Sequence, residues 1–168
     1  MFFEDNATGI ELLRRAKYFE YIPEPMYFYY QHNASTIHVI TKERCEDRLE
    51  AMRIMHRYAK ENGYLNEYYD EIEYKFSNLF YQNTLFSYMQ TAKKINFKFV
   101  YNMGREMREY FPDFQENPYY TKLVPYEEKK LMKLQQQCNG IFIIYYRALY
   151  LYRKIRKRIQ KKVRGELK

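Results

Sequence analysis

The sequence of 168 residues contains no tryptophan, only five glycines, five prolines and two cysteines. So few glycines and prolines argue against a disordered chain and against an all-β fold with many tight turns. Cys45 and Cys138 are too few for a disulfide framework, and neither has the Cys/His spacing of a zinc site. We therefore expect two reduced thiols that are buried in a protein core.

Long apolar runs are also absent. The longest uncharged one, residues 141–146, is far shorter than the roughly 20 residues that cross a bilayer as a helix. No secretory signal peptide precedes the first charged residues. These absences predict a cytoplasmic protein that is soluble or lies peripherally on the inner face of the cell membrane.

Aromatic side chains are abundant, with 21 tyrosines and 12 phenylalanines. Such density fits long helices that pack through large rings and leave hydroxyl groups at the surface. A surface that handles oligosaccharides would also be aromatic, but core packing is the commoner cause. The length fits one domain with a single core of ordinary size, or slightly more.

The positive charge of the chain is confined to its C-terminal tail. The formal net charge is +8. Residues 147–168 contain ten basic residues and one acid, whereas the first 146 residues contain 19 basic and 20 acidic residues. Basicity is therefore a property of the tail and not of the whole chain.

Beyond Thr41, apolar residues recur at the three- and four-residue steps of helices. The pattern predicts helices over residues 41–62, 65–91, 96–110, 125–139 and 141–164, with an irregular linker at 111–118. Asn62 and Gly63 suit a left-handed helix end, and this short connection predicts that the first two helices form an antiparallel hairpin. Phe76 lies on the most apolar line of that hairpin.

The first forty residues have a different pattern. A helix is predicted over residues 6–17, after which Pro23 and Pro25 force extended geometry. The aromatic residues 26–32 predict a strand, which within this chain could pair only with residues 19–22. Residues 33–36 have the composition of a turn.

Glu4 and Asp5 stand at the start of the first predicted helix. A helix start favours negative charge and side-chain acceptors, so an N-cap is the simplest interpretation of this pair. A carboxylate that stays ionised and half-exposed there could instead serve as a general base. The pair alone favours the cap.

The order of motifs over residues 2–38 favours the general base. The segment reads Phe-Phe-Glu-Asp-Asn, then a leucine-containing helix, then Pro-Glu-Pro-Met-Tyr-Phe-Tyr-Tyr, then Asn-Ala-Ser-Thr. This order resembles the acceptor-side end of bacterial family 2 glycosyltransferases of the GT-A fold. The resemblance implies that Asp5 is the catalytic base with Glu4 beside it, and that His32, Ser35 and Thr36 lie in a substrate-binding loop. The helical remainder is similar only to the kind of C-terminal extension that such enzymes carry.

The resemblance also implies parts that this sequence does not contain. A GT-A enzyme has an N-terminal nucleotide-binding half with a metal-binding Asp-x-Asp, and no Asp-x-Asp occurs here. We therefore expect Met1 to mark an internal start within a longer protein, and we expect this chain alone to hold no cofactor and to be inactive. The complete enzyme would use Mg²⁺ or Mn²⁺, a nucleotide-sugar, and a glycan or lipid-linked acceptor of a cell-surface polysaccharide or glycolipid.

The predicted fold is mainly α. It is a helical bundle or hairpin array with a small N-terminal helix–strand remnant of a GT-A α/β domain and a long basic C-terminal helix. The predicted domains are residues 1–40, the acceptor-side remnant; residues 41–140, the helical domain; and residues 141–168, the basic amphipathic helix.

On the last helix, one apolar stripe is formed by Ala148, Leu151 or Tyr152, Ile155, Ile159 and Val163. We expect the stripe up to Leu151 to pack on the helical domain. From Tyr152 onward the density of cations predicts contact with an anionic membrane surface, through Arg153, Lys154, Arg156, Lys157, Arg158, Lys161 and Lys162.

The alternative is a non-enzymatic helical module whose basic tail binds nucleic acid and stacks its tyrosines on bases. This hypothesis explains the tail but leaves residues 2–36 without a role. We therefore expect no specific nucleic-acid partner.

Overall fold

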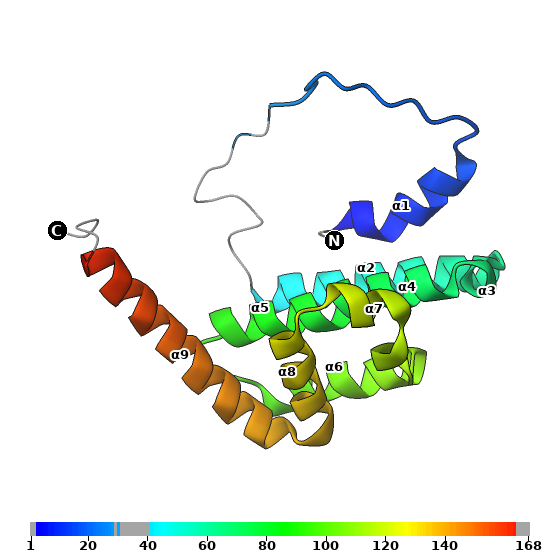
Figure 1. Cartoon of the computed structure of the whole chain (residues 1–168). Helices are drawn as coiled ribbons and strands as arrows, with labels where there is room; N and C mark the ends of the chain where they lie inside the picture. The colour runs from blue at the N-terminus through cyan, green and yellow to red at the C-terminus, as the bar shows by residue number, and fades with distance from the viewer. Residues whose placement is uncertain (1–2, 29, 31–40, 164–168) are drawn as a thin grey trace. The chain divides into compact units, whose positions relative to one another are not determined.

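The computed structural model describes residues 3–28, 30 and 41–163, apart from the side chain of Val163. These residues form helices and no strand, so the prediction of a mainly α fold is confirmed (Figure 1). The chain divides into two compact units, Met1–Thr84 (unit 1) and Leu85–Lys168 (unit 2), which are described separately. The predicted division into three domains stays a prediction.

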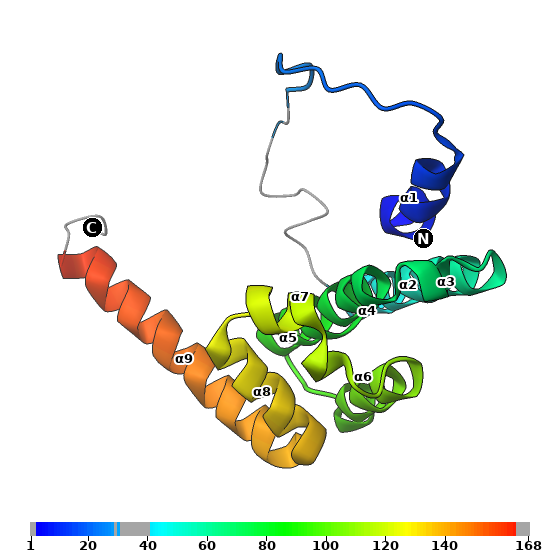
Figure 2. The same ribbon diagram turned by 45° about the vertical axis from the view of Figure 1, so that its right-hand side comes forward.

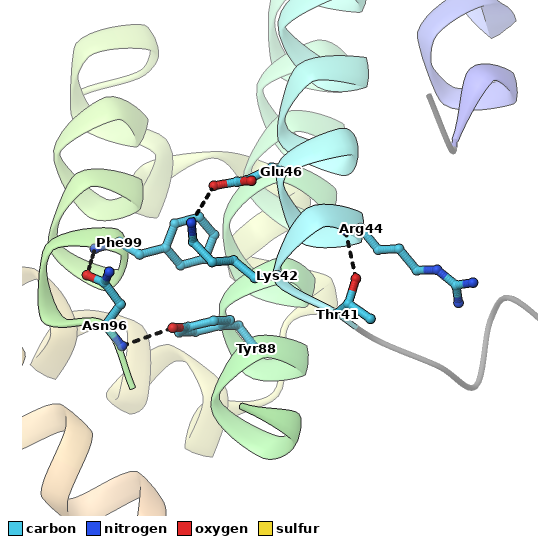
Figure 3. A network of polar contacts seen from close by, with 7 residues as sticks. All are labelled: Thr41, Lys42, Arg44, Glu46, Tyr88, Asn96 and Phe99. Carbon is cyan, nitrogen blue, oxygen red and sulfur yellow. Dashed lines mark hydrogen bonds and ion pairs between the residues drawn. The ribbon is translucent and has the colours of Figure 1, made fainter. Parts of the chain in front are cut away.

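Unit 1 contains α1 (Glu4–Arg15), α2 (Lys42–Glu61), α3 (Tyr64–Glu67), α4 (Tyr69–Phe76) and the π-helix η1 (Ser77–Asn83). Thr41 caps α2, because its Oγ1 accepts a hydrogen bond of 3.2 Å from the backbone N–H of Arg44. Lys42 and Glu46 form an ion pair of 2.9 Å on the next turn (Figure 3). Gly63 ends this segment with a φ of 79°, as its predicted left-handed role requires.

The core of unit 1 is the predicted hairpin. α2 lies beside α4 and η1 and runs antiparallel to them (Figure 1 and Figure 2). Phe76 is fully buried, stacks on Phe80 with 4.4 Å between ring centroids, and meets the edge of His56 at 5.9 Å. Burial of these rings supplies the main stabilisation of the hairpin.

The predicted helix over residues 65–91 is not uniform. α3 ends at Glu67, and α4 then leads through η1 into α5 (Thr84–Thr91). In η1 two side-chain hydrogen bonds span five residues: Asn83 Nδ2 donates to Asn78 Oδ1 at 2.9 Å, and Thr84 Oγ1 donates to the carbonyl of Leu79 at 2.7 Å. These bonds support the wider π turn, which periodicity alone does not predict.

Unit 2 contains α6 (Phe97–Tyr110), the 3-10 helix η2 (Phe114–Glu116), α7 (Pro118–Leu123), α8 (Tyr126–Gln137) and α9 (Asn139–Val163), after most of α5. Asn96 caps α6, since its Oδ1 accepts from the N–H of Phe99 at 3.1 Å. The N–H of Asn96 donates in turn to the Tyr88 hydroxyl of α5 at 2.9 Å (Figure 3). The start of α6 is therefore tied to α5.

A close approach of α6 and α8 organises the core of unit 2. A methyl group placed on Gly104 would lie 2.5 Å from the side-chain amide of Gln135, so no larger residue fits without movement. The Gln135 amide nitrogen donates to the carbonyl of Val100 at 3.0 Å and to Asn139 Oδ1 at 2.6 Å. This buried glutamine therefore joins α6, α8 and the start of α9.

Two expectations about unit 2 need correction. The predicted linker at residues 111–118 contains η2 and three buried side chains, Phe111, Phe114 and Asn117. Phe114 meets Tyr120 edge-to-face at 5.3 Å, so this segment is packed by its own rings. Cys138 is exposed at the end of α8, where the chain turns into α9, and only Cys45 is a buried thiol.

The predicted strand is not seen. Met26, Tyr27, Phe28 and Tyr30 form no strand and have exposed side chains. The rest of this prediction, together with the turn at 33–36, lies outside the described residues. Within the described ranges no neighbouring strand is present to share the N–H and C=O groups of this segment, and β-propensity cannot replace that partner.

Candidate functional site

Glu4 and Asp5 lie in the first turn of α1, two residues before the predicted start. Both carboxylates are exposed. Asp5 Oδ1 accepts hydrogen bonds from the backbone N–H of Asn6 at 2.8 Å and from its side-chain amide at 3.2 Å. Oδ2 accepts none from the part of the chain that the structure describes. One oxygen is therefore engaged at the helix start while the other is open to a ligand.

The start of α1 is fixed by contacts with α2. Phe3, just before the helix, has a φ of 68°, and its ring lies 4.6 Å below the Arg48 guanidinium of α2. Ala7 on the following turn is buried. Burial lowers the pKa of Arg48, yet an arginine keeps its charge at neutral pH. Asp5 therefore projects from a position held on the packed hairpin.

The predicted N-cap role of this pair is wrong, because Phe3 occupies the N-cap position and no side chain caps it. The helix dipole still favours a carboxylate in the first turn. A general base must also be ionised and accessible to the proton that it takes, and the open oxygen of Asp5 has that accessibility. The prediction that one carboxylate faces a concave surface stays a prediction.

A groove that the sequence did not predict lies at the other end of α1. Its volume is about 430 Å³, and its mainly apolar walls include Ile10, Leu13, Phe19, Met55, Tyr64 and Ile72. The Arg14 guanidinium lies 4.7 Å above the Tyr64 ring, and the Tyr64 hydroxyl raises the pKa of Arg14. The groove depends on three separate segments of unit 1, so no local motif could have indicated it.

The other predicted substrate-binding residues, His32, Ser35 and Thr36, lie outside the described residues. Among the described residues, no group of His, Cys, Asp and Glu could hold a metal ion. The role of this loop and the metal of the complete enzyme therefore stay predictions.

The basic residues predicted for membrane contact all lie on the last three turns of α9 and are exposed: Arg153, Lys154, Arg156, Lys157, Arg158, Lys161 and Lys162. Arg153 donates to Glu127 of α8 at 2.5 Å, an ion pair that solvent screens. None of the described helices combines the length and the apolarity needed to cross a membrane.

One expectation about α9 is wrong. The stripe up to Leu151 was expected to pack on the helical domain, but Ala148 and Leu151 are exposed. Phe142 and Tyr146, on the opposite side of the helix, are buried instead. Tyr146 stacks on Phe86 of α5 at 5.3 Å and accepts a hydrogen bond from Gln90 at 2.9 Å. The side of α9 that packs into unit 2 is therefore the one that carries the large aromatic rings.

Comparison with protein-family models, with curated proteins and with solved structures finds no match for this chain. The family resemblance of residues 2–38 accordingly stays a proposal.

Proposed function

We propose that this chain is the C-terminal portion of a nucleotide-sugar-dependent glycosyltransferase and supplies its catalytic base, Asp5. The observation that carries the proposal is the position of Asp5 in the first turn of α1, exposed and with Oδ2 open. The motif order of residues 2–38 supports it, because the resembled family places its base at such a helix start.

The proposed reaction is a direct displacement. Asp5 takes the proton of an acceptor hydroxyl while that oxygen attacks the anomeric carbon of the donor. The bond from the anomeric carbon to the nucleoside diphosphate breaks, the diphosphate leaves with its electron pair, and the configuration inverts.

The donor and metal sites belong to a nucleotide-binding half that we place outside this chain. A Mg²⁺ or Mn²⁺ ion held there would neutralise the leaving diphosphate. This sequence has no Asp-x-Asp to hold such an ion. The chain alone is therefore expected to bind no cofactor and to transfer no sugar.

The first test is genetic. A reading frame that runs into Met1 from upstream, and that encodes several strands and an Asp-x-Asp, is the expected result. An upstream region that encodes no such half, in frame or adjacent, contradicts the proposal.

The second test is enzymatic and uses the chain joined to that half. Asp5→Asn should lower turnover by about 10²–10⁴-fold, the usual contribution of a general base. Stability should change by less than about 1 kcal/mol, because Asp5 is exposed and asparagine keeps a side-chain oxygen that can accept from the N–H of Asn6. Glu4→Gln is the matched control and should retain most of the turnover. Near-normal transfer by the Asp5 variant would remove Asp5 from the catalytic role.

A nucleic-acid-binding module is the competing function, and the exposed cations of α9 are the observation that favours it. Single-stranded and duplex oligonucleotides should bind this chain weakly and without sequence preference. A tight complex that deletion of residues 153–168 abolishes would favour the module over the glycosyltransferase.

A further inference from the structure

The outer side of α9 is an exposed aliphatic stripe. Its members follow one another at three- and four-residue steps and share one side of the helix: Ile141, Ile144, Ala148, Leu151, Ile155 and Ile159. The stripe is about 27 Å long at 1.5 Å per residue. Phe142 and Tyr146 on the opposite side are the residues that pack into unit 2. So large an apolar surface, continuous on one side of a helix, indicates a binding surface.

Cations lie on both sides of this stripe. Lys154 and Arg156 are each about 100° around the helix from Ile155, and Arg158 lies closer to it. No acidic residue occurs on α9. Long basic side chains beside an apolar stripe can bury their methylene groups at an interface and keep their charges in the polar layer.

A groove runs along one flank of the stripe, between α9 and the end of α5. Its volume is about 480 Å³; three cations, Lys93, Arg147 and Lys154, line it together with Ala148 and Leu151 of the stripe. Arg147 donates to the carbonyls of Met89 and Ala92 at 3.1 and 3.2 Å, which fixes its guanidinium at the end of α5. The groove thus combines fixed positive charge with an apolar edge.

We propose that the outer side of α9 lies on an anionic bilayer and that this groove receives the phosphate of a lipid headgroup. The stripe then enters the boundary between headgroups and acyl chains, and the flanking cations contact anionic lipid. Each basic residue held at the surface strengthens binding by a factor of about five.

Two other occupants fit the surface less well. A second copy of this chain packed through the same stripe would add a helix with eight cations and no acid to pair with them, and like charges repel. A nucleic acid would neutralise the cations but leave the aliphatic stripe in water. Of these three occupants, the anionic bilayer alone satisfies both the stripe and its charged flanks.

The experiment is co-sedimentation of the full chain with vesicles of phosphatidylcholine alone or mixed with phosphatidylglycerol, at low and high salt. Binding should need phosphatidylglycerol and should weaken at least tenfold at high salt, because surface charges are screened. Binding that is equal on both vesicles and indifferent to salt overturns the proposal. Sugar donor is absent, so this result is independent of the test of glycosyl transfer.

Variants separate the stripe from the groove. Ile144→Asp with Ile155→Asp should abolish binding, since it places charge in the apolar boundary at two stripe positions outside the groove. Lys93→Glu with Lys154→Glu should weaken binding at least 25-fold. Lys98→Glu with Lys122→Glu makes the same change of net charge at exposed positions away from the groove, and should weaken binding less than fivefold. If the Lys93/Lys154 and Lys98/Lys122 variants lose vesicle affinity equally, the headgroup site is overturned.

Circular dichroism checks that each variant remains folded. The helical signal should not change, because all substituted residues are exposed. Sedimentation velocity tests the second-copy alternative. A dimer that disappears in the Ile144→Asp, Ile155→Asp variant, without vesicle binding by the unsubstituted chain, would overturn the proposal.

Discussion

Unit 1 and unit 2 each combine a packed helical core with a segment that exposes large apolar side chains. In unit 1 that segment is residues 16–28, where Phe28 is 90% exposed. In unit 2 it is the outer stripe of α9, where Ile144 is 74% exposed. The two surfaces have similar apolarity but differ in backbone structure and charge.

The backbone difference decides what can cover each surface. An extended segment presents N–H and C=O groups sideways, and these favour pairing with another strand. The α9 helix satisfies its backbone internally and exposes side chains alone, which suits a bilayer surface. Residues 16–28 also carry Glu20 and Glu24 beside Lys17, whereas α9 carries cations only. We therefore propose that the first surface pairs with a β-sheet of the proposed nucleotide-binding half and that the second lies on anionic lipid.

The two cores also differ. Unit 1 is packed by stacked rings around Phe76, whereas α6 and α8 of unit 2 approach closely at Gly104. Removing a ring leaves a cavity in unit 1. Adding a methyl group at Gly104 overpacks the contact between α6 and α8 in unit 2. Substitutions of opposite kind should therefore damage the two units.

The largest effect is expected in unit 1. Phe76→Ala should lower the free energy of unfolding by about 3–5 kcal/mol, because the ring is fully buried and leaves a cavity. Urea unfolding followed by circular dichroism measures the loss. Phe97→Ala on α6 is the control, since that ring is exposed, and it should cost less than about 1 kcal/mol. Similar losses in the two variants would contradict the buried stack.

A pH dependence should follow from Cys45 of unit 1. Burial raises the pKa of this thiol from its ordinary value near 9 to about 11. Between pH 9 and pH 11 the folded state keeps the proton of this thiol while the unfolded state loses it. The contribution of Cys45 to folding stability is therefore complete below pH 9 and is lost as the pH rises through 11. The loss between pH 8 and pH 11 should be about 2 kcal/mol.

The measurement compares the chain with its Cys45→Ala variant by urea unfolding at pH 8 and pH 11. Lysines and tyrosines also titrate in this range, so only the difference between the two proteins reports Cys45. Parallel losses of stability in both proteins would show that this thiol does not titrate differently on unfolding.

Helix boundaries were predictable because local chemistry sets them. Thr41 begins α2 because its hydroxyl accepts a hydrogen bond from the backbone. Gly63 follows the end of α2 because glycine readily adopts a left-handed φ. Pro112 and Pro125 likewise lie just outside helices, as the missing N–H of proline favours. These signals are contained within a few residues, so no knowledge of the tertiary structure is needed.

Tertiary choices were not predictable in the same way. Both sides of α9 are apolar near residues 141–146, and packing against α6 and α8 determines that Phe142 is buried and Ile144 exposed. The π turn of η1 depends on hydrogen bonds of Asn83 and Thr84 that replace the ordinary helical spacing. For the candidate site, a helix start at Asp5 follows from the sequence, but its anchoring by Arg48 does not.

A smaller effect is expected for an added methyl group in unit 2. Gly104→Ala should lower stability by about 1–2 kcal/mol: overpacking against the fixed Gln135 amide costs about 1–3 kcal/mol, and the better helix propensity of alanine returns part of it. Gly140→Ala is the control, because nothing lies within 4 Å of the added group, and it should be neutral or slightly stabilising. Stabilisation by both variants would show that α6 and α8 can separate without cost.

The smallest effect is expected in the exposed segment of unit 1. Met26→Ser with Phe28→Ser should change the stability of this chain by less than about 0.5 kcal/mol, because both side chains are exposed. The same pair should clearly weaken association with the nucleotide-binding half, since alternate residues of a strand face one side and would be buried together there. Phe97→Ser with Tyr126→Ser is the matched control, because both rings are exposed and lie outside residues 16–28. Urea unfolding and a binding titration with the purified half measure the two quantities. A large loss of stability in the isolated chain would mean that residues 26–28 already pack on unit 1, and the assignment of this surface to a missing sheet would then fail.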